Sequence, residues 1–195
     1  EQRRTTLDLD VQHRPRLSGI HDIVFGANYR FSSDDITTSG SFIQIEPRNR
    51  SFSLGSLFIN DEITLIPERL RGTLGIRLEN NSFTGFEPQP HARLAWTPGR
   101  NQTIWAAASR AVRTPSRAEP DATVEFSATP PNARVPFPVL IRNAPNADRS
   151  QLSETINAIE VGYRHQFDAT LSVDVAVFSN YYSRLIGARS GAQTI

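Results

Sequence analysis

The feature that most constrains this chain is an alternation of apolar and polar residues with a period of two. It is clearest in residues 70–79, where Leu74, Ile76 and Leu78 alternate with small or polar residues such as Arg77. Successive side chains of a β-strand point to opposite faces of a sheet, whereas a helix repeats its apolar positions every three to four residues. The segment therefore predicts a strand with one apolar face and one polar face.

The same alternation recurs along the chain and predicts an all-β fold. In residues 170–182, for example, Val173, Val175 and Val177 share one face. Turn-forming residues such as Pro98-Gly99 separate neighbouring segments, which favours antiparallel pairing of consecutive strands. We expect about eight meandering strands, over residues 6–12, 23–31, 51–65, 70–79, 91–96, 103–110, 155–166 and 170–182.

The connections between these strands alternate in length. They are short near Arg14, Pro67, Pro98 and Asp168, and longer over residues 32–50, 114–151 and, less markedly, 83–90. Transmembrane β-barrels combine short periplasmic turns with long extracellular loops and place aromatic girdles near the strand ends. Aromatic residues near predicted strand ends are Tyr29, Phe31, Trp96, Tyr163, Phe167, Tyr181 and Tyr182. The pattern favours the wall of a membrane barrel, with a soluble antiparallel sandwich or closed barrel as the alternative.

Composition excludes several other classes of protein. Lys and Arg number 21 against 20 Asp and Glu, so no basic excess indicates a nucleic-acid partner. There is no cysteine, which removes disulfides and thiolate metal sites. No run approaches the roughly 18 apolar residues of a membrane helix, and no signal peptide opens the sequence. A barrel strand needs only about 9 to 11 residues, so a membrane remains compatible with these observations.

Charged residues inside the predicted strands indicate which face meets water. They are Glu62, Arg77, Glu79, Arg93, Glu160 and Arg164. An Arg or Lys that faces lipid near the midplane of a bilayer costs about 2 to 4 kcal/mol. We therefore expect these six side chains to point toward the interior of a barrel.

Candidate catalytic residues are sparse, and we expect no enzymatic activity. The four histidines, His13, His21, His91 and His165, do not have the spacing of a metal site. Ser109, Ser116 and Ser153 lack the context of an activated nucleophile. The sequence predicts neither a cofactor nor a resident metal.

Several motifs resemble the carboxyl-terminal half of TonB-dependent outer-membrane receptors, which import iron chelates, cobalamin and similar scarce nutrients. The most specific is W-A-A-A-S-R-A-V-R-T-P-S-R at residues 105–117, followed about 40 residues later by E-V-G-Y-R at 160–164. Others are T-L-D-L-D-V-Q-H-R at 6–14, N-D-E-I-T-L at 60–65, L-R-G-T-L-G-I-R-L-E-N-N-S-F-T-G-F-E-P-Q-P at 70–90 and A-R-L-A-W-T-P at 92–98. The resemblance covers nearly the whole chain.

The resemblance implies a piece of a larger structure. Plugged outer-membrane transporters have 22-stranded barrels, so about eight strands would form roughly a third of the wall. We expect residues 1–195 to be a partial barrel domain that lacks the plug, the segment that engages TonB and the terminal strands. The alternative is a small self-contained barrel or sheet that acts as an outer-membrane or ligand-binding module, since eight strands can close on themselves.

The same resemblance implies the location and partners of the protein. We expect it in the outer membrane of a Gram-negative bacterium, in contact with lipid, with TonB through the missing amino-terminal region, and with a metal chelate or similar small ligand. Ligand recognition would involve the loops over residues 32–50, 83–90 and 114–151. Our candidate ligand-contacting residues in or beside these loops are Phe83, Phe86, Arg113, Arg117, Arg134 and Arg142.

Overall fold

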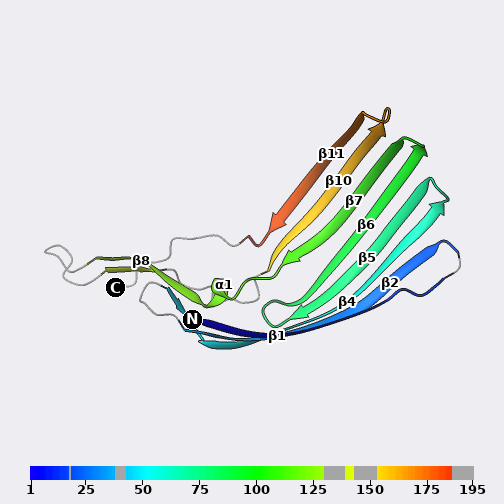
Figure 1. Cartoon of the computed structure of the whole chain (residues 1–195). Helices are drawn as coiled ribbons and strands as arrows, with labels where there is room; N and C mark the ends of the chain where they lie inside the picture. The colour runs from blue at the N-terminus through cyan, green and yellow to red at the C-terminus, as the bar shows by residue number, and fades with distance from the viewer. Residues whose placement is uncertain (18, 38–42, 130–138, 143–152, 186–195) are drawn as a thin grey trace.

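The protein is built around one antiparallel sheet of eight strands (Figure 1). The computed structural model describes residues 1–17, 19–37, 43–129, 139–142 and 153–185. The strands of the main sheet are β1 (Gln2–His13), β2 (His21–Ile36), β4 (Asn49–Ile66), β5 (Leu70–Asn81), β6 (Gly85–Gly99), β7 (Gln102–Arg113), β10 (Glu154–Gln166) and β11 (Ser172–Ser183). They lie in the order β1-β2-β4-β5-β6-β7-β10-β11, which confirms the predicted meander.

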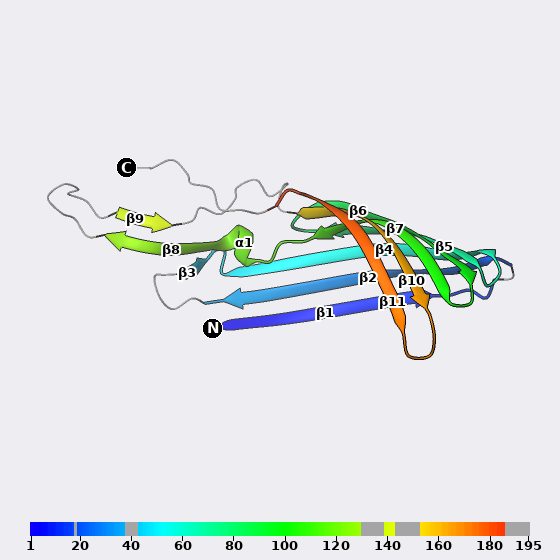
Figure 2. The same ribbon diagram turned by 90° about the horizontal axis from the view of Figure 1, so that it is seen from above.

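The main sheet is open and strongly twisted. Its edge strands, β1 and β11, do not pair with each other among the described residues. Figure 2 shows that these two strands run in clearly different directions, as expected when the twist between neighbours accumulates across a wide sheet. The described chain is therefore a curved stretch of wall, and it does not form the small closed barrel considered as an alternative.

The register of the strands places their apolar residues on one face, which we call the apolar face. One row of register partners runs from Val11 through Ala27 and Leu57 to Leu78, and another from Leu94 through Ala106 and Val161 to Val177. Most of these side chains are exposed: the exposed fraction is 60% for Leu57 and 70% for Val177, while Leu78 is partly buried. Soluble monomers rarely expose apolar patches larger than a few hundred Å². This face therefore requires an apolar environment outside the chain.

The described part of the chain has almost no internal hydrophobic core. Among its residues, Ala122 is the single hydrophobic residue that is buried. The buried polar and charged residues are Asp34, Ser56, Glu79, Asn81, Glu87, Arg117, Asp121, Ser153 and Thr155. A soluble sandwich shows the opposite distribution, because its two sheets pack their apolar faces together. The arrangement instead resembles a barrel wall, in which the apolar residues face outward.

The opposite face, which we call the polar face, carries all six charged residues that the sequence assigned to a barrel interior. Glu62, Arg77, Glu79, Arg93, Glu160 and Arg164 occupy its register positions. Rings cover glycines on the same face: Phe58 lies opposite Gly26, and Trp105 opposite Gly162. A Cβ added to Gly162 would lie 2.3 Å from the Trp105 ring, so only glycine allows this close packing.

The predicted loop over residues 83–90 was wrong. Residues 82–84 form a tight turn, and β6 begins at Gly85, whose φ of 75° is one that glycine adopts readily. β6 contains Pro88 and Pro90, which cannot donate ladder hydrogen bonds. In the structure they pair with β5, while β7 joins β6 only from His91 onward. The prolines thus lie where β6 behaves as an edge strand, which tolerates them.

The two longer connections contain more regular structure than the sequence indicated. β2 continues to Ile36 and β4 begins at Asn49, with Asp35 and Asn49 in register. The short strand β3 (Ile43–Ile45) follows β2, and the connection after β7 contains helix α1 (Ala118–Asp121) and strands β8 (Ala122–Thr129) and β9 (Val139–Arg142). These three strands form a second sheet in the order β3-β8-β9. Figure 2 shows β8 and β9 extending past the ends of the main strands.

No helix in the described ranges is long and apolar enough to cross a membrane, a finding that concerns helices alone.

Candidate functional site

The candidate site lies at one end of the main sheet, which we call the loop rim. It comprises the strand ends at Gln2, Ile36, Asn49, Asn81, Gly85, Arg113, Glu154 and Ser183, together with the connections that join them. Eight of the nine buried polar residues lie at or next to these ends, the exception being Ser56. Burial of polar groups is costly unless they are hydrogen-bonded or paired. Their concentration at the loop rim therefore indicates an organised network of polar contacts.

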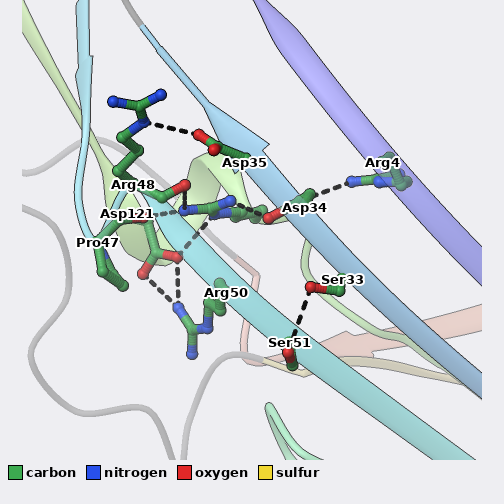
Figure 3. A network of polar contacts seen from close by, with 10 residues as sticks. Arg4, Ser33, Asp34, Asp35, Pro47, Arg48, Arg50, Ser51 and Asp121 are labelled. Atoms are coloured by element: carbon green, nitrogen blue, oxygen red, sulfur yellow. Dashed lines mark hydrogen bonds and ion pairs between the residues drawn. The ribbon is translucent and has the colours of Figure 1, made fainter.

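Arg117 is the centre of a buried ion network at the loop rim. Figure 3 labels its partners Asp34, Pro47, Arg48 and Asp121. Its guanidinium donates to a carboxylate oxygen of Asp34 on β2 and to the backbone carbonyls of Pro47 and Arg48, the latter over 3.0 Å. Its Nε lies 3.4 Å from Oδ2 of Asp121. The side chain is only 6% exposed. Both terminal nitrogens of the guanidinium therefore donate to acceptors of this chain, whereas the buried Nε has no hydrogen-bond partner and only the ion pair with Asp121.

The network continues on both sides of Arg117. Arg4 on β1 donates to Oδ2 of Asp34 over 3.2 Å, and Arg50 on β4 donates to both carboxylate oxygens of Asp121. The charges alternate along the series Arg4, Asp34, Arg117, Asp121, Arg50. Each buried carboxylate thus lies between two guanidinium groups, which offsets the cost of removing it from water.

An aromatic pair extends this network toward the next hairpin. Phe83, in the turn between β5 and β6, stacks on Phe52 of β4 with ring centroids 4.8 Å apart. The guanidinium carbon of Arg50 lies 4.6 Å from the centroid of the Phe83 ring, which is the geometry of a cation–π contact. Arg50 therefore links the ion network to the turn at 82–84.

Two buried carboxylates form a second cluster at the loop rim. Glu79 on β5 and Glu87 on β6 are register partners. Oε1 of Glu79 accepts from Asn81 over 3.1 Å and from the Thr114 hydroxyl over 3.3 Å. Glu87 accepts from the Ser153 hydroxyl over 2.6 Å and from Arg110 over 3.0 Å.

A third cluster surrounds Arg113 at the end of β7. Its guanidinium donates to Glu119 of α1 and, over 2.6 Å, to Glu154 of β10. Burial opposes ionisation of Glu119, but hydrogen bonds from Arg113 and the Ser116 amide outweigh it and hold the pKa of Glu119 below its ordinary value. Glu119 therefore stays charged and keeps α1 attached to β7.

Away from the rim, the polar face is hollowed by a groove of about 670 Å³. Its lining includes Arg77, His91, Arg93, Ser109 and Glu160. Among the described residues, Arg93 and Glu160 form no hydrogen bond or ion pair with another side chain. These two charges are available to a partner on the polar face.

The structure places the six predicted ligand residues in different surroundings. Arg117 is buried in the ion network and binds Asp34 there, and Phe83 contacts both Phe52 and Arg50. Phe86 is 62% exposed and lies on the apolar face, in register with Asn80. Arg113 is half exposed and bound to Glu119 and Glu154.

The two remaining candidates lie further along the connection. Arg142 belongs to β9, in register with Glu125 of β8. Arg134 lies outside the described residues.

Sequence reasoning missed most of the residues that organise the rim. Asp34, Arg50, Glu87 and Asp121 fall inside the predicted loops, and the sequence assigned none of them a role there. Glu79 was predicted as a charge on an alternating strand, and Arg113, Arg117 and Phe83 were predicted as ligand contacts and not as organisers of the rim. The available signal was the motif R-T-P-S-R at 113–117, which holds two of the organising arginines.

Comparison with known proteins gives one family. The family model described as "TonB dependent receptor-like, beta-barrel" matches residues 1–195. A search of curated proteins returned no match.

Several solved structures share the fold. The ferric enterobactin receptor PfeA of Pseudomonas aeruginosa, in complex with enterobactin, is 19% identical with a TM-score of 0.69 over 93% of this chain and 27% of its own. The siderophore receptor PirA of the same species is 19% identical, with a TM-score of 0.70 over 93% of this chain and 32% of its own. PirA of Acinetobacter baumannii is 16% identical, with a TM-score of 0.69 over 93% and 27%. The chain thus spans about a third or less of these structures.

Proposed function

This chain belongs to the TonB-dependent receptor β-barrel family, and we propose that it forms part of an outer-membrane receptor that binds and imports a scarce nutrient such as an iron–siderophore complex. The observation that carries the proposal is the two-faced open sheet, matched to the family over its whole length. The apolar face would contact the lipid of the outer membrane, and the polar face would line the barrel interior.

The edges of the sheet support a place within a larger barrel. A lone wide sheet with free edge strands is prone to pair with other chains, whereas closure into a barrel removes such edges. We propose that β1 and β11 pair with further strands of the same receptor, and that residues 1–195 are a partial barrel domain.

The polar groove supports contact with another part of the receptor. Arg93 and Glu160 offer one charge of each sign there, without side-chain partners in the described ranges. We propose that a plug domain of the full receptor packs against them, and that TonB binds elsewhere, through a region outside these residues.

The ligand proposal rests on chemistry and on the relatives. The structural relatives named above are siderophore receptors, one of them in complex with enterobactin. Ferric siderophores are commonly anionic, so arginines of the long connection are suitable contacts. We propose Arg113, Arg134 and Arg142 as contacts, and structural roles for Phe83, Phe86 and Arg117.

A catalytic function has no support. The family is one of receptors, and the described residues contain no group of three or more side chains that could hold a metal ion. We propose that the protein is a receptor without enzymatic activity, without a cofactor and without a nucleic-acid partner.

The proposal is tested with the full-length receptor gene expressed in a strain that lacks its own siderophore receptors. Radiolabelled ferric enterobactin and a panel of hydroxamate and catecholate ferric siderophores are the probes, and both binding to cells and TonB-dependent uptake are measured. In the test variant, residues 123–150 are replaced by a Gly-Ser linker, which leaves Asp121 and Ser153 in place.

We expect the unmodified receptor to bind at least one ferric siderophore and the linker variant to lose binding. Both proteins should keep the heat-modifiable migration of a folded barrel on a denaturing gel. Unchanged binding by the folded linker variant would overturn the role of the connection. Absence of uptake for every probe would overturn the siderophore proposal.

A further inference from the structure

The segment over residues 114–121, which we call the strap, crosses the polar face at the loop rim. It begins at the end of β7, but its side chains contact distant strands. Thr114 donates to Glu79 of β5, Arg117 to Asp34 of β2, and Asp121 accepts from Arg50 of β4. By register, Glu79, Asp34 and Arg50 all belong to the polar face. The strap therefore crosses the rim end of this face from β7 to β4 and β2, and Figure 1 shows α1 at that end of the main sheet.

The strap ends where the two long connections pair with each other. Directly after Asp121, strand β8 pairs with β3, with Gln44 opposite Thr123 and Ile45 opposite Ala122. The Glu46 amide donates to the Asp121 carbonyl over 3.0 Å. Arg117 is the residue that joins both connections to the wall, since it binds Asp34 on β2 and the carbonyls of Pro47 and Arg48 beside β3.

The chemistry of Arg117 excludes a direct role in ligand binding in this arrangement. Its two terminal nitrogens donate to Asp34 and two backbone carbonyls, its Nε lies 3.4 Å from the Asp121 carboxylate, and its side chain is 6% exposed. Removing the cation would leave two buried carboxylates with one partner less each, an arrangement that is strongly destabilising. Lysine could not replace it fully, because an ammonium group lacks the planar fork that reaches several acceptors at once.

We propose that Arg117 is a positioning residue, which fixes the strap and the paired strands β3 and β8 as one unit and so sets the place from which the ligand-binding part of the connection departs. The proposal rests on the proposed function for its effect on ligand binding. Its structural half, that Arg117 controls the pairing of β3 with β8, does not depend on any ligand.

The test uses the full-length receptor in outer-membrane vesicles, with Gln44→Cys and Thr123→Cys introduced together. Register partners on antiparallel strands have Cα atoms about 4.5 to 5.5 Å apart, which suits a disulfide. The rate of cross-linking under mild oxidation reports the pairing of β3 with β8. It is measured in this background and with Arg117→Met, Arg117→Lys or the control Arg71→Met, which removes an exposed arginine far from the loop rim.

We expect Arg117→Met to slow cross-linking by about tenfold or more, Arg117→Lys to lie between it and the parent, and Arg71→Met to have no effect. Unchanged cross-linking in a folded Arg117→Met or Arg117→Lys receptor would overturn the proposal. Heat-modifiable migration confirms folding, and the lysine variant decides the question if the methionine variant does not fold.

A second measurement separates positioning from contact with ligand. Binding of ferric enterobactin, or of the siderophore that the unmodified receptor binds best, is compared before and after complete oxidation of the Arg117→Met double-cysteine receptor. We expect weakened binding in the reduced form and recovery in the oxidised form, because the disulfide replaces the lost constraint. Weak binding in both forms would show that Arg117 touches the ligand and would overturn the proposal. If the unmodified receptor binds no siderophore, the proposed function fails, while the cross-linking rates still decide the structural half.

Discussion

Glu79 and Glu87 lie directly opposite each other on β5 and β6, both are buried, and each holds one end of the connection over residues 114–153. Glu79 accepts a hydrogen bond from Thr114, where the connection begins, and Glu87 accepts one from Ser153, where it ends. Like charges at facing positions of a sheet are destabilising. The ends of the connection and the nearby arginines compensate for this repulsion.

The two carboxylates are expected to differ in how their replacement by the amide changes the stability of the folded receptor. Glu87 pairs with Arg110, so Glu87→Gln leaves a half-buried guanidinium without its counter-charge and should destabilise the folded receptor by about 1 to 3 kcal/mol. Within the described ranges, Glu79 accepts from the neutral groups of Asn81 and Thr114, so Glu79→Gln removes repulsion and should be neutral or stabilising. Urea unfolding of the full receptor in lipid vesicles measures both. An equal loss in the two variants would contradict this assignment of partners.

The assignment of the two faces predicts different outcomes for one substitution at adjacent alanines. Ala106 lies on the apolar face between Leu94 and Val161, and Ala107 on the polar face between Arg93 and Glu160. Ala106→Arg should destabilise the barrel by about 2 to 4 kcal/mol, because it places a cation in lipid. Ala107→Arg should be clearly less destabilising than Ala106→Arg, because it places the cation on the polar face beside Glu160 and not in lipid. The same urea titration in vesicles distinguishes them, and equal effects would refute the proposed orientation in the membrane.

The strands of the main sheet could be predicted from the sequence because each of them follows from a simple local pattern. A period of two fixes which side chains of one strand share a face, so the shared face of Glu160 and Arg164 followed from counting. The cost of a charge that faces lipid then predicted the same side for Arg77. The short turns followed from Pro98-Gly99 and similar pairs. These signals are local, and each is complete within about ten residues.

The loop rim could not be predicted for the opposite reason. Arg117 and its partner Asp34 are 83 residues apart, and neither has a neighbour in sequence that indicates burial. A buried arginine in a network looks like a solvated arginine until the strands that surround it are placed. The start of β6 could not be predicted for a related reason: whether a strand that contains Pro88 and Pro90 has a partner on both sides depends on where β7 begins to pair.

Glycine at position 162 is expected to be required for the packing of Trp105. Its Cβ position lies 2.3 Å from the indole ring, so Gly162→Ala must displace the ring and should destabilise the receptor by about 1 to 3 kcal/mol. Gly55→Ala is the matched control, since the nearest atom to its Cβ position, on Tyr29, is 3.9 Å away. Urea unfolding with tryptophan fluorescence checks both variants. A red shift of the folded-state emission in Gly162→Ala alone would show the ring leaving its place, and unchanged stability with an unchanged spectrum would contradict the prediction.

The turn between β10 and β11 is expected to weaken in acid because of Asp168. Hydrogen bonds from the Thr170 hydroxyl, the Thr170 amide and the Leu171 amide all reach Oδ1, over 2.7, 2.7 and 2.9 Å, and lower the pKa of Asp168 below its ordinary value of 3.8. A carboxyl group whose pKa is lower in the folded state contributes stability above its unfolded pKa and loses it as pH falls through the folded pKa. The stabilisation should therefore be constant from pH 7 to about 5 and decline once the pH falls below 3.8.

Hydrogen exchange at the Thr170 and Leu171 amides measures this dependence directly. Protection factors, corrected for intrinsic exchange at each pH, should be higher in the parent than in Asp168→Ala at neutral pH and should converge with it in acid. Asp168→Asn keeps an oxygen acceptor but carries no charge, so its protection should be intermediate and independent of pH across this range. A parent receptor whose protection does not change between pH 5 and pH 2 would show that the charge of Asp168 does not hold the turn, and equal protection in all three proteins at pH 7 would exclude the hydrogen bonds as its source.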